Sequence, residues 1–326
     1  MPTSPGEGPR QLNTIPGSGR NGALVIGART QRQGTGPYIA AGLAAAGLPV
    51  TGIVGTGDSS VAEAAQALSD QHGITARGYT DLAQALAELA PLAVAICSPW
   101  RFHQAQLEAV AAAGCHCLVE KPLAWPLDHG CAAALVSKFA QRHLLLQVVN
   151  QWPTTLAAFR AIYGELPEAE AVARFQMRLS PISIGPDMVT DSAPHFLGML
   201  DTLCGPGSCQ EVRLQRDSAG EQHSLRLDCR FQHARGSCEA TLYLETQQRR
   251  PRPVWYQVNE CRLDREVTLP AYRQYMVGAT GRIALEDPMA QVAAEFARGV
   301  AEGRATDSAS LLSMHDNLLR LAAAWK

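Results

Sequence analysis

Ala23-Leu24-Val25-Ile26-Gly27 is a short apolar run that ends at a glycine, and a helix of small residues is expected soon after it, from Pro37 to Ala46. Apolar residues in direct succession, without polar ones between them, are typical of a strand buried on both faces. A buried strand that passes through a short loop into a helix is the first unit of a parallel sheet covered by helices.

The same rhythm of strand and helix continues to Val149. Further strands are expected at Val50–Val54, Ala93–Cys97, Cys115–Val119 and Leu144–Val149. Helices are expected between them, starting near Ser59, Asp81, Phe102 and Leu127. This alternation predicts a doubly wound parallel sheet, an α/β domain of the Rossmann type, over residues 21–150. Residues 1–20 are rich in Pro, Gly and Ser, and we expect them to form a flexible leader.

After about Gln151 the rhythm changes. A helix is expected from Asp191 to Leu203, and several strand-like segments then follow one another without helices between them. Strands in succession favour antiparallel pairing, so residues 151–326 are predicted to form an α+β domain with a largely antiparallel open sheet. Two helices, Met289–Ala301 and Ser308–Trp325, are expected to close the chain.

Composition excludes several classes of function. A chain of 326 residues suits two domains, and a net charge of -2 without a long basic run argues against nucleic acid as a partner. No apolar run approaches the roughly 18 to 20 residues that cross a bilayer, so no membrane partner is expected. The nine cysteines are scattered, and the pair Cys115 and Cys117 lacks zinc-site spacing. We expect no metal, and a reducing, cytoplasmic location.

The loop after the first strand is a candidate phosphate-binding segment. In sheets of this kind the first strand ends in a glycine-rich turn that presents backbone N–H groups and a helix N-terminus to a pyrophosphate. The compact G-x-G-x-x-G spacing is absent, and a longer loop with two arginines takes its place. The candidate cofactor-binding residues here are Gly27, Arg29, Arg32, Gly34, Thr35 and Gly36. The alternative is a strand–helix connection that is merely rich in glycine.

The end of the second strand bears on the choice of cofactor. An acidic residue there accepts the ribose hydroxyls of NAD and repels the extra phosphate of NADP. The strand is followed by Gly55-Thr56-Gly57, and the first carboxylate, Asp58, comes only after them. Thr56 and Ser59, together with the loop arginines, offer groups that hold a 2′-phosphate. The sequence therefore favours NADP(H) over NAD(H).

Three later segments carry a resemblance to a known family. Residues 95–103 read AICSPWRFH, residues 113–123 read AGCHCLVEKPL, and residues 191–201 read DSAPHFLGMLD. They resemble the Gfo/Idh/MocA family, named after glucose-fructose oxidoreductase and inositol dehydrogenase, in its "SP" turn, its "EKP" motif and its D-x-x-x-H block. Residues 276–283 are similar to the family's late glycine turn, and the resemblance extends over about residues 22 to 326.

The resemblance implies site residues. Lys121 would sit beside the nicotinamide and polarise the reacting oxygen, and His195 would serve as general acid/base because its ordinary pKa lies near the working pH. Asp191 shares a helical face with His195, or is only the helix N-cap. The implied cofactor contacts are Ser98, Pro99, His103, Glu120 and Lys121. For His103 a structural role at the start of its helix is the alternative.

The expected activity is hydride transfer between NAD(P) and a carbinol or ketone of a sugar, cyclitol or related small molecule. Two alternatives remain open: reduction of a C=N bond on the same scaffold, and a non-catalytic nucleotide-binding sensor. Trp100 and Trp152 depart from the family pattern, and each is a candidate for substrate contact, although Trp152 equally suits packing. Relatives pair through the exposed face of the C-terminal sheet, so a homodimer or homotetramer is expected.

Overall fold

The computed structural model describes residues 20–29, 34–219 and 222–325, and the chain divides into two compact units. The first unit comprises the residues up to Trp125 together with 133–149 and 289–307. The second comprises 126–132, 150–288 and the residues from Ser308 onward. After Val149 most of the chain belongs to the second unit, and residues 289–307, which include most of helix α8 (Pro288–Ala301), belong again to the first.

The first unit is built on a six-stranded sheet in the order β3-β2-β1-β4-β5-β6, with every neighbouring pair parallel. Its strands are β1 (Ala23–Ile26), β2 (Val50–Val54), β3 (Arg77–Tyr79), β4 (Ala93–Ile96), β5 (His116–Val119) and β6 (Leu146–Val148). All residues of β1, β4 and β5 are buried, as expected for strands covered on both faces. The predicted doubly wound parallel sheet is confirmed. The direction of winding reverses between β1 and β4, the place where such sheets bind ligands.

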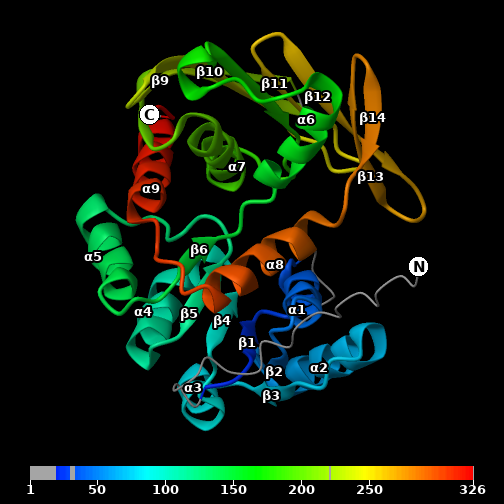
Figure 1. Ribbon diagram of the computed structural model, residues 1–326, viewed down its shortest axis with the longest axis vertical. Helices are drawn as coiled ribbons and strands as arrows, with labels where there is room; N and C mark the ends of the chain where they lie inside the picture. Colours follow the sequence, from blue (N-terminus) through cyan, green and yellow to red (C-terminus); the bar gives the residue numbers. More distant parts are fainter. Residues whose placement is uncertain (1–19, 30–33, 220–221, 326) are drawn as a thin grey trace, which may run out of the picture. The chain divides into compact units, whose positions relative to one another are not determined.

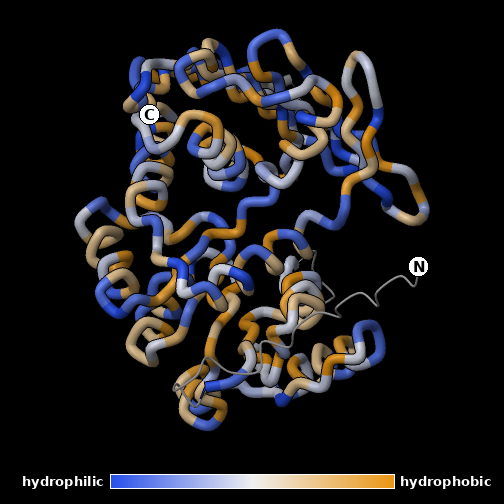
Figure 2. The backbone as a smooth tube through the Cα atoms, viewed as in Figure 1, coloured by the Kyte–Doolittle hydropathy of each residue, from blue (hydrophilic) through white to orange (hydrophobic). Residues whose placement is uncertain are grey.

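Helices cover this sheet (Figure 1). They are α1 (Gly36–Ala45), α2 (Asp58–His72), α3 (Leu82–Leu89), α4 (His103–Ala113), α5 (His129–Ala140) and α8 (Pro288–Ala301). Helix α8 joins the core of the first unit through Val292, Phe296 and Val300, and a Cβ at Gly42 of α1 would stand 2.7 Å from Ala293 Cβ. Figure 2 shows hydrophobic residues along the central strands and hydrophilic ones at the outer end of α2.

The second unit is built on an eight-stranded sheet in the order β14-β13-β12-β11-β7-β10-β9-β8. Its strands are β7 (Arg174–Leu179), β8 (Gly207–Ala219), β9 (Gln222–His233), β10 (Gly236–Glu245), β11 (Trp255–Val258), β12 (Cys261–Thr268), β13 (Arg273–Gly278) and β14 (Gly281–Ala284). Among the described strand pairs of this second sheet, β7–β10 is parallel and the others are antiparallel, so the predicted largely antiparallel sheet is confirmed.

One face of this second sheet is covered by helices, and we call it the inner face. The helices are α6 (Leu156–Tyr163), α7 (Asp187–Cys204) and α9 (Ser308–Ala323). Alternate residues of β7 point to the inner face, where Phe175 stacks on Phe196 of α7 at 5.6 Å. The intervening residues, such as Arg178, lie on the outer face, and they are only partly buried.

Two details differ from the sequence-based expectations. Helix α7 begins at Asp187, four residues before the expected start at Asp191, so Asp191 lies inside the helix and is not its N-cap. The edge strand β3 was not predicted, because two of its three residues are exposed and give no apolar run. No helix among residues 20–29, 34–219 and 222–325 is long and apolar enough to span a membrane.

Candidate active site

The glycines after β1 hold the strand end and the start of α1 close together. Gly27 has a φ of +87°, and a Cβ there would stand 2.8 Å from the Cys97 carbonyl oxygen at the end of β4. A Cβ at Gly36 would stand 2.4 Å from the Gly27 carbonyl oxygen. Both positions therefore require glycine, and they bring backbone to the switch point between β1 and β4.

The remaining loop residues fall into two groups. Gly34 and Thr35 are half-buried at the start of α1, and Thr35 makes no side-chain capping bond to the helix. Arg29 is exposed. Arg32 lies outside the described residues, so its predicted cofactor contact remains a prediction. The backbone at Gly27 and Gly36 fits a ligand that needs close approach, such as a dinucleotide pyrophosphate.

At the end of β2 the chain turns directly into α2. Gly57 is the N-cap residue, and Asp58 opens the helix with its side chain exposed. Thr56 and Ser59 are also exposed, whereas Ser60 is buried and donates to the Gly57 carbonyl at 2.8 Å. A carboxylate therefore stands in the first turn of α2, close after the strand end, together with the predicted hydroxyls.

His103 joins the two motifs that follow β4 and β5. Its side chain has 0% exposure. Ring atom Nδ1 lies 2.8 Å from the Pro122 carbonyl oxygen, and Nε2 lies 2.9 Å from the Ser98 carbonyl oxygen. The ring thus ties the Ser98-Pro99 turn to the turn that contains Lys121, and the predicted structural role of His103 has direct support in this geometry.

Further hydrogen bonds fix the same region. The Glu120 amide donates to the Ile96 carbonyl at 2.8 Å, and the Lys121 amide donates to Glu120 Oε2 at 3.1 Å. Ser98 Oγ lies 2.6 Å from Gln106 Oε1 on α4 and donates to it. Lys121 is half-buried. Ser98, Pro99, Glu120 and Lys121 therefore gather at the carboxyl ends of neighbouring strands.

In the second unit, α7 carries the other predicted catalytic residues. Asp191 and His195 lie one helical turn apart, and both are half-buried. The His195 ring meets the ring of Trp152 edge-on, with 6.4 Å between centroids. Trp152 is 4% exposed, which favours its packing role over an open stacking platform. Trp100 of the first unit is half-buried in a short 3-10 helix, Trp100–Phe102.

Sequence reasoning missed Arg265, which lies beside Trp152, and Arg252, whose carbonyl Arg265 contacts. The Arg265 guanidinium lies over the Trp152 ring at 5.6 Å, and its Nη2 donates to the Arg252 carbonyl at 2.9 Å. Burial lowers the pKa of both Arg265 and Arg252. The available signal was the spacing Leu263-x-Arg265-x-Val267, which places a cation on the same face as an apolar strand residue.

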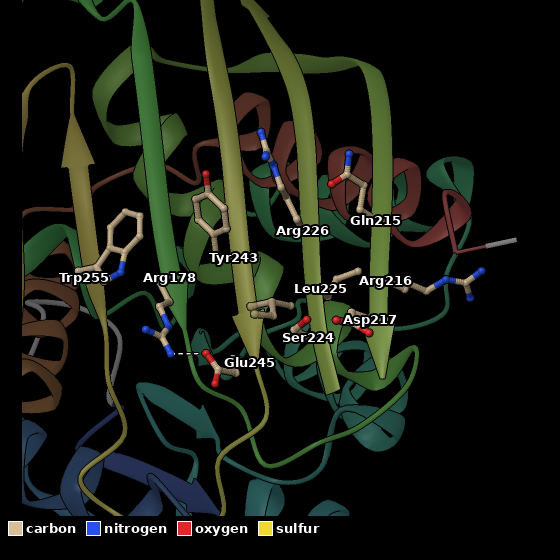
Figure 3. A pocket seen from close by; sticks show the side chains of 11 residues that line it. Arg178, Gln215, Arg216, Asp217, Ser224, Leu225, Arg226, Tyr243, Glu245 and Trp255 are labelled. Atoms are coloured by element: carbon tan, nitrogen blue, oxygen red, sulfur yellow. Dashed lines mark hydrogen bonds and ion pairs between the residues drawn. The ribbon is translucent and has the colours of Figure 1, made fainter. Parts of the chain in front are cut away.

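A shallow cavity of about 520 Å³ lies elsewhere, on the outer face of the second sheet. Figure 3 shows its side chains projecting from the strands on the side away from the helices. Arg178 and Glu245 form an ion pair there, and Tyr243 lies beside Trp255 with 5.6 Å between ring centroids. None of the predicted site residues lines this cavity.

The chain is similar to known oxidoreductases. Residues 22–150 match a model described as "Oxidoreductase family, NAD-binding Rossmann fold" (GFO_IDH_MocA). A UDP-N-acetylglucosamine 3-dehydrogenase of Acidithiobacillus ferrooxidans is 30% identical over 161 residues, which is 48% of either chain. That alignment therefore spans about half the length of the relative.

Solved structures agree over a greater length. The structure of UDP-N-acetylglucosamine 3-dehydrogenase from Acidithiobacillus ferrooxidans superposes with a TM-score of 0.67 at 20% identity, covering 94% of this chain and 97% of that one. Levoglucosan dehydrogenase in complex with NADH superposes with a TM-score of 0.66 at 16% identity, covering 94% and 98%. At these identities the likeness establishes a shared fold across both units.

The winding order of the parallel sheet, the glycine turn after β1, the motifs after β4 and β5, and the match of residues 22–150 agree with one another. Residues 22–150 of this chain therefore match the NAD-binding Rossmann domain of the Gfo/Idh/MocA oxidoreductase family.

Proposed function

We propose that this protein is a nicotinamide-dependent dehydrogenase that moves a hydride between the cofactor and a carbinol or ketone of a sugar, cyclitol or related small molecule. One observation carries the proposal. His103 ties the turn after β4 to the turn that bears Lys121, with ring-to-carbonyl distances of 2.8 and 2.9 Å. This fixes the turn that bears the cationic Lys121 at the same edge of the sheet where Gly27 and Gly36 allow the end of β1 and the start of α1 to pack closely.

The proposed roles follow from charge and proton transfer. Bound nicotinamide supplies the hydride acceptor or donor. Lys121 places a positive charge beside the reacting oxygen, which lowers the pKa of a hydroxyl or polarises a carbonyl. His195 takes or returns the hydroxyl proton, and Asp191, one turn earlier on α7, orients it. We further propose that residues 21–150 bind the cofactor and that 151–326 bind substrate and form the homo-oligomer.

The cofactor contacts are proposed at Gly27, Gly34, Thr35 and Gly36 and in the turns after β2, β4 and β5. A relative of the same fold is solved with NADH, and the Asp58 carboxylate in the first turn of α2 would disfavour a 2′-phosphate. NAD(H) is therefore the cofactor we propose first. The preference for NADP(H) that the hydroxyls of Thr56 and Ser59 indicated stays a prediction.

Calorimetric titration with NADH and with NADPH, followed by turnover assays on a panel of sugars, tests this function. Lys121→Ala should lower kcat by about 100-fold or more and leave the cofactor Kd within about twofold. The matched control is Lys138→Ala, because Lys138 is 52% exposed on α5 and should be dispensable. Full activity in Lys121→Ala would refute the assignment, and failure to bind either cofactor would favour a non-catalytic role.

A further inference from the structure

Arg265 is a cation on the buried face of the second sheet. Strand β12 pairs Arg265 with Met276 of β13, and Met276 has 0% exposure. Leu263, two residues earlier on the same strand, also has 0% exposure. Because alternate residues of a strand share a face, Arg265 lies on the inner face beside the apolar Leu263 and Met276. A cation in such a place normally has a partner.

The hydrogen bonds of Arg265 leave most of its donors unused. Nη2 donates to the Arg252 carbonyl at 2.9 Å, and Nη1 donates to Gln274 Oε1 at 3.4 Å. Its Nε is buried and meets no acceptor among the described residues. Arg252 has the same property, because its Nε is buried and, in the part of the chain that the structure describes, has no partner. A guanidinium offers five N–H donors in a planar fork.

In the part of the second unit that the structure describes, the positive charges of Arg252 and Arg265 are not paired with carboxylates nearby. Within the described residues of the second unit, no carboxylate lies within 4.0 Å of either Arg252 or Arg265. Burial is the largest cause that lowers the pKa of Arg265; Tyr272 raises it in part, and the positive charges of Arg250 and Arg252 lower it again. Burial and mutual repulsion therefore oppose the charges of Arg252 and Arg265, and an anion would relieve both.

We propose that Arg265, assisted by Arg252, binds an anionic group, a phosphate or a carboxylate, on the substrate. The proposal rests on the function proposed above and narrows it to sugars that carry such a group. The planar guanidinium of arginine can donate two parallel hydrogen bonds to two oxygens of a phosphate or of a carboxylate. Arg265 and His195 both lie against the Trp152 ring, at 5.6 and 6.4 Å from its centroid, so one substrate molecule can meet both.

Binding to the NADH-saturated protein tests the site without turnover, because bound NADH occupies the cofactor's own pyrophosphate contacts. The probes are inorganic pyrophosphate, glucuronate and, as the neutral comparison, glucose, each titrated by calorimetry. Pyrophosphate or glucuronate should bind at least about tenfold more tightly than glucose. Tight binding of pyrophosphate alone identifies a phosphate site, and tight binding of glucuronate alone identifies a carboxylate site.

Variants assign the effect to Arg265. Arg265→Met should weaken binding of the preferred anion about 10- to 100-fold while leaving the Kd of NADH unchanged. The control is Arg262→Met on the same strand but the opposite face, where Arg262 lies over Trp255 at 4.3 Å and pairs with Asp264. That variant should bind the anion as the wild type does. Arg252→Met provides a second route should Arg265→Met fail to fold.

The outcomes separate this proposal from the proposed function. Equal binding of charged and neutral probes by the wild type, or unchanged anion binding in both arginine variants, would overturn the anion site. If neutral sugars are turned over as well as anionic ones, the dehydrogenase stands and the anion site is wrong. If the anions bind through Arg265 but no sugar is oxidised or reduced, the anion site stands and the proposed function fails.

Discussion

Replacing His103 by Leu tests the contact that connects the two motifs of the first unit. The side chain has 0% exposure and holds two backbone carbonyls, those of Pro122 and Ser98, at 2.8 and 2.9 Å. Leucine fills similar space but donates no hydrogen bond. A neutral imidazole carries one N–H, so His103 donates to one of these two carbonyls, and leucine removes that donor. One buried carbonyl left unpaired costs about 1–3 kcal/mol, and we expect a loss of that size in the free energy of unfolding.

The assay is differential scanning calorimetry together with urea unfolding of the full chain. For a unit of this size 1 kcal/mol corresponds to roughly 2–4 °C, so the first unit should melt about 2–12 °C lower than in the wild type. Turnover should fall as well, since the turn that carries Lys121 loses its tie to Ser98. Cofactor affinity should change less.

The matched control is His129→Leu. His129 is 61% exposed and pairs with Asp316 at 2.8 Å, a surface contact worth about 0–1 kcal/mol. Its melting temperature should stay within about 3 °C of the wild type. A His103→Leu protein that melts like the wild type and keeps full turnover would refute the reasoning, because the buried carbonyl would then need no donor.

Three further predictions concern other parts of the chain. Gly36→Ala should lower the free energy of unfolding by about 1–3 kcal/mol and weaken NADH binding, because a Cβ there would stand 2.4 Å from the Gly27 carbonyl oxygen. Gly281→Ala in the second unit, where a Cβ would meet only an ordinary contact at 3.5 Å, is the control in urea unfolding and calorimetry. Burial, followed by Arg20, lowers the pKa of His116 below 6.5, so the unfolded chain binds the proton first and stability falls as pH drops below about 6.5. The wild type minus His116→Gln difference in urea unfolding should shrink toward pH 5, and a difference independent of pH would contradict this. Asn317→Leu should cost about 2–4 kcal/mol in urea unfolding, because the 1% exposed amide accepts from the Cys209 amide at 2.7 Å; a loss below about 0.5 kcal/mol would contradict it.

Much of the first unit could be predicted from local pattern. β1 and β4 are buried on both faces, and a strand of that kind consists of consecutive apolar residues that can be recognised in the sequence alone. β3 escaped prediction because an edge strand is only half covered, and two of its three residues are exposed. The roles of Lys121 and His195 came from motif resemblance, and they remain proposals that mutagenesis tests.

Helix α7 shows where local signals compete with packing. Asp191 has good N-cap chemistry and Pro194 suits a first turn, which together predicted a helix start at Asp191. The helix begins at Asp187, because Met188 and Val189 are buried at 1% and 0% exposure and extend its apolar side. Burial of these side chains outweighs the preference of one carboxylate for the cap position.

The sequence by itself determined the alternation of strand and helix, the glycine turn and the family motifs, because each of these depends on residues close together in the chain. Only the tertiary structure decided that His103 contacts the Ser98 and Pro122 carbonyls. It alone decided that Arg265 lies on a buried face against Trp152, with no carboxylate of the described residues of its unit within 4.0 Å. The physical reason is that the partners of a buried polar group come from strands and turns far apart in sequence. Whether a charge is balanced therefore depends on the order of strands in the sheet, which local periodicity does not specify.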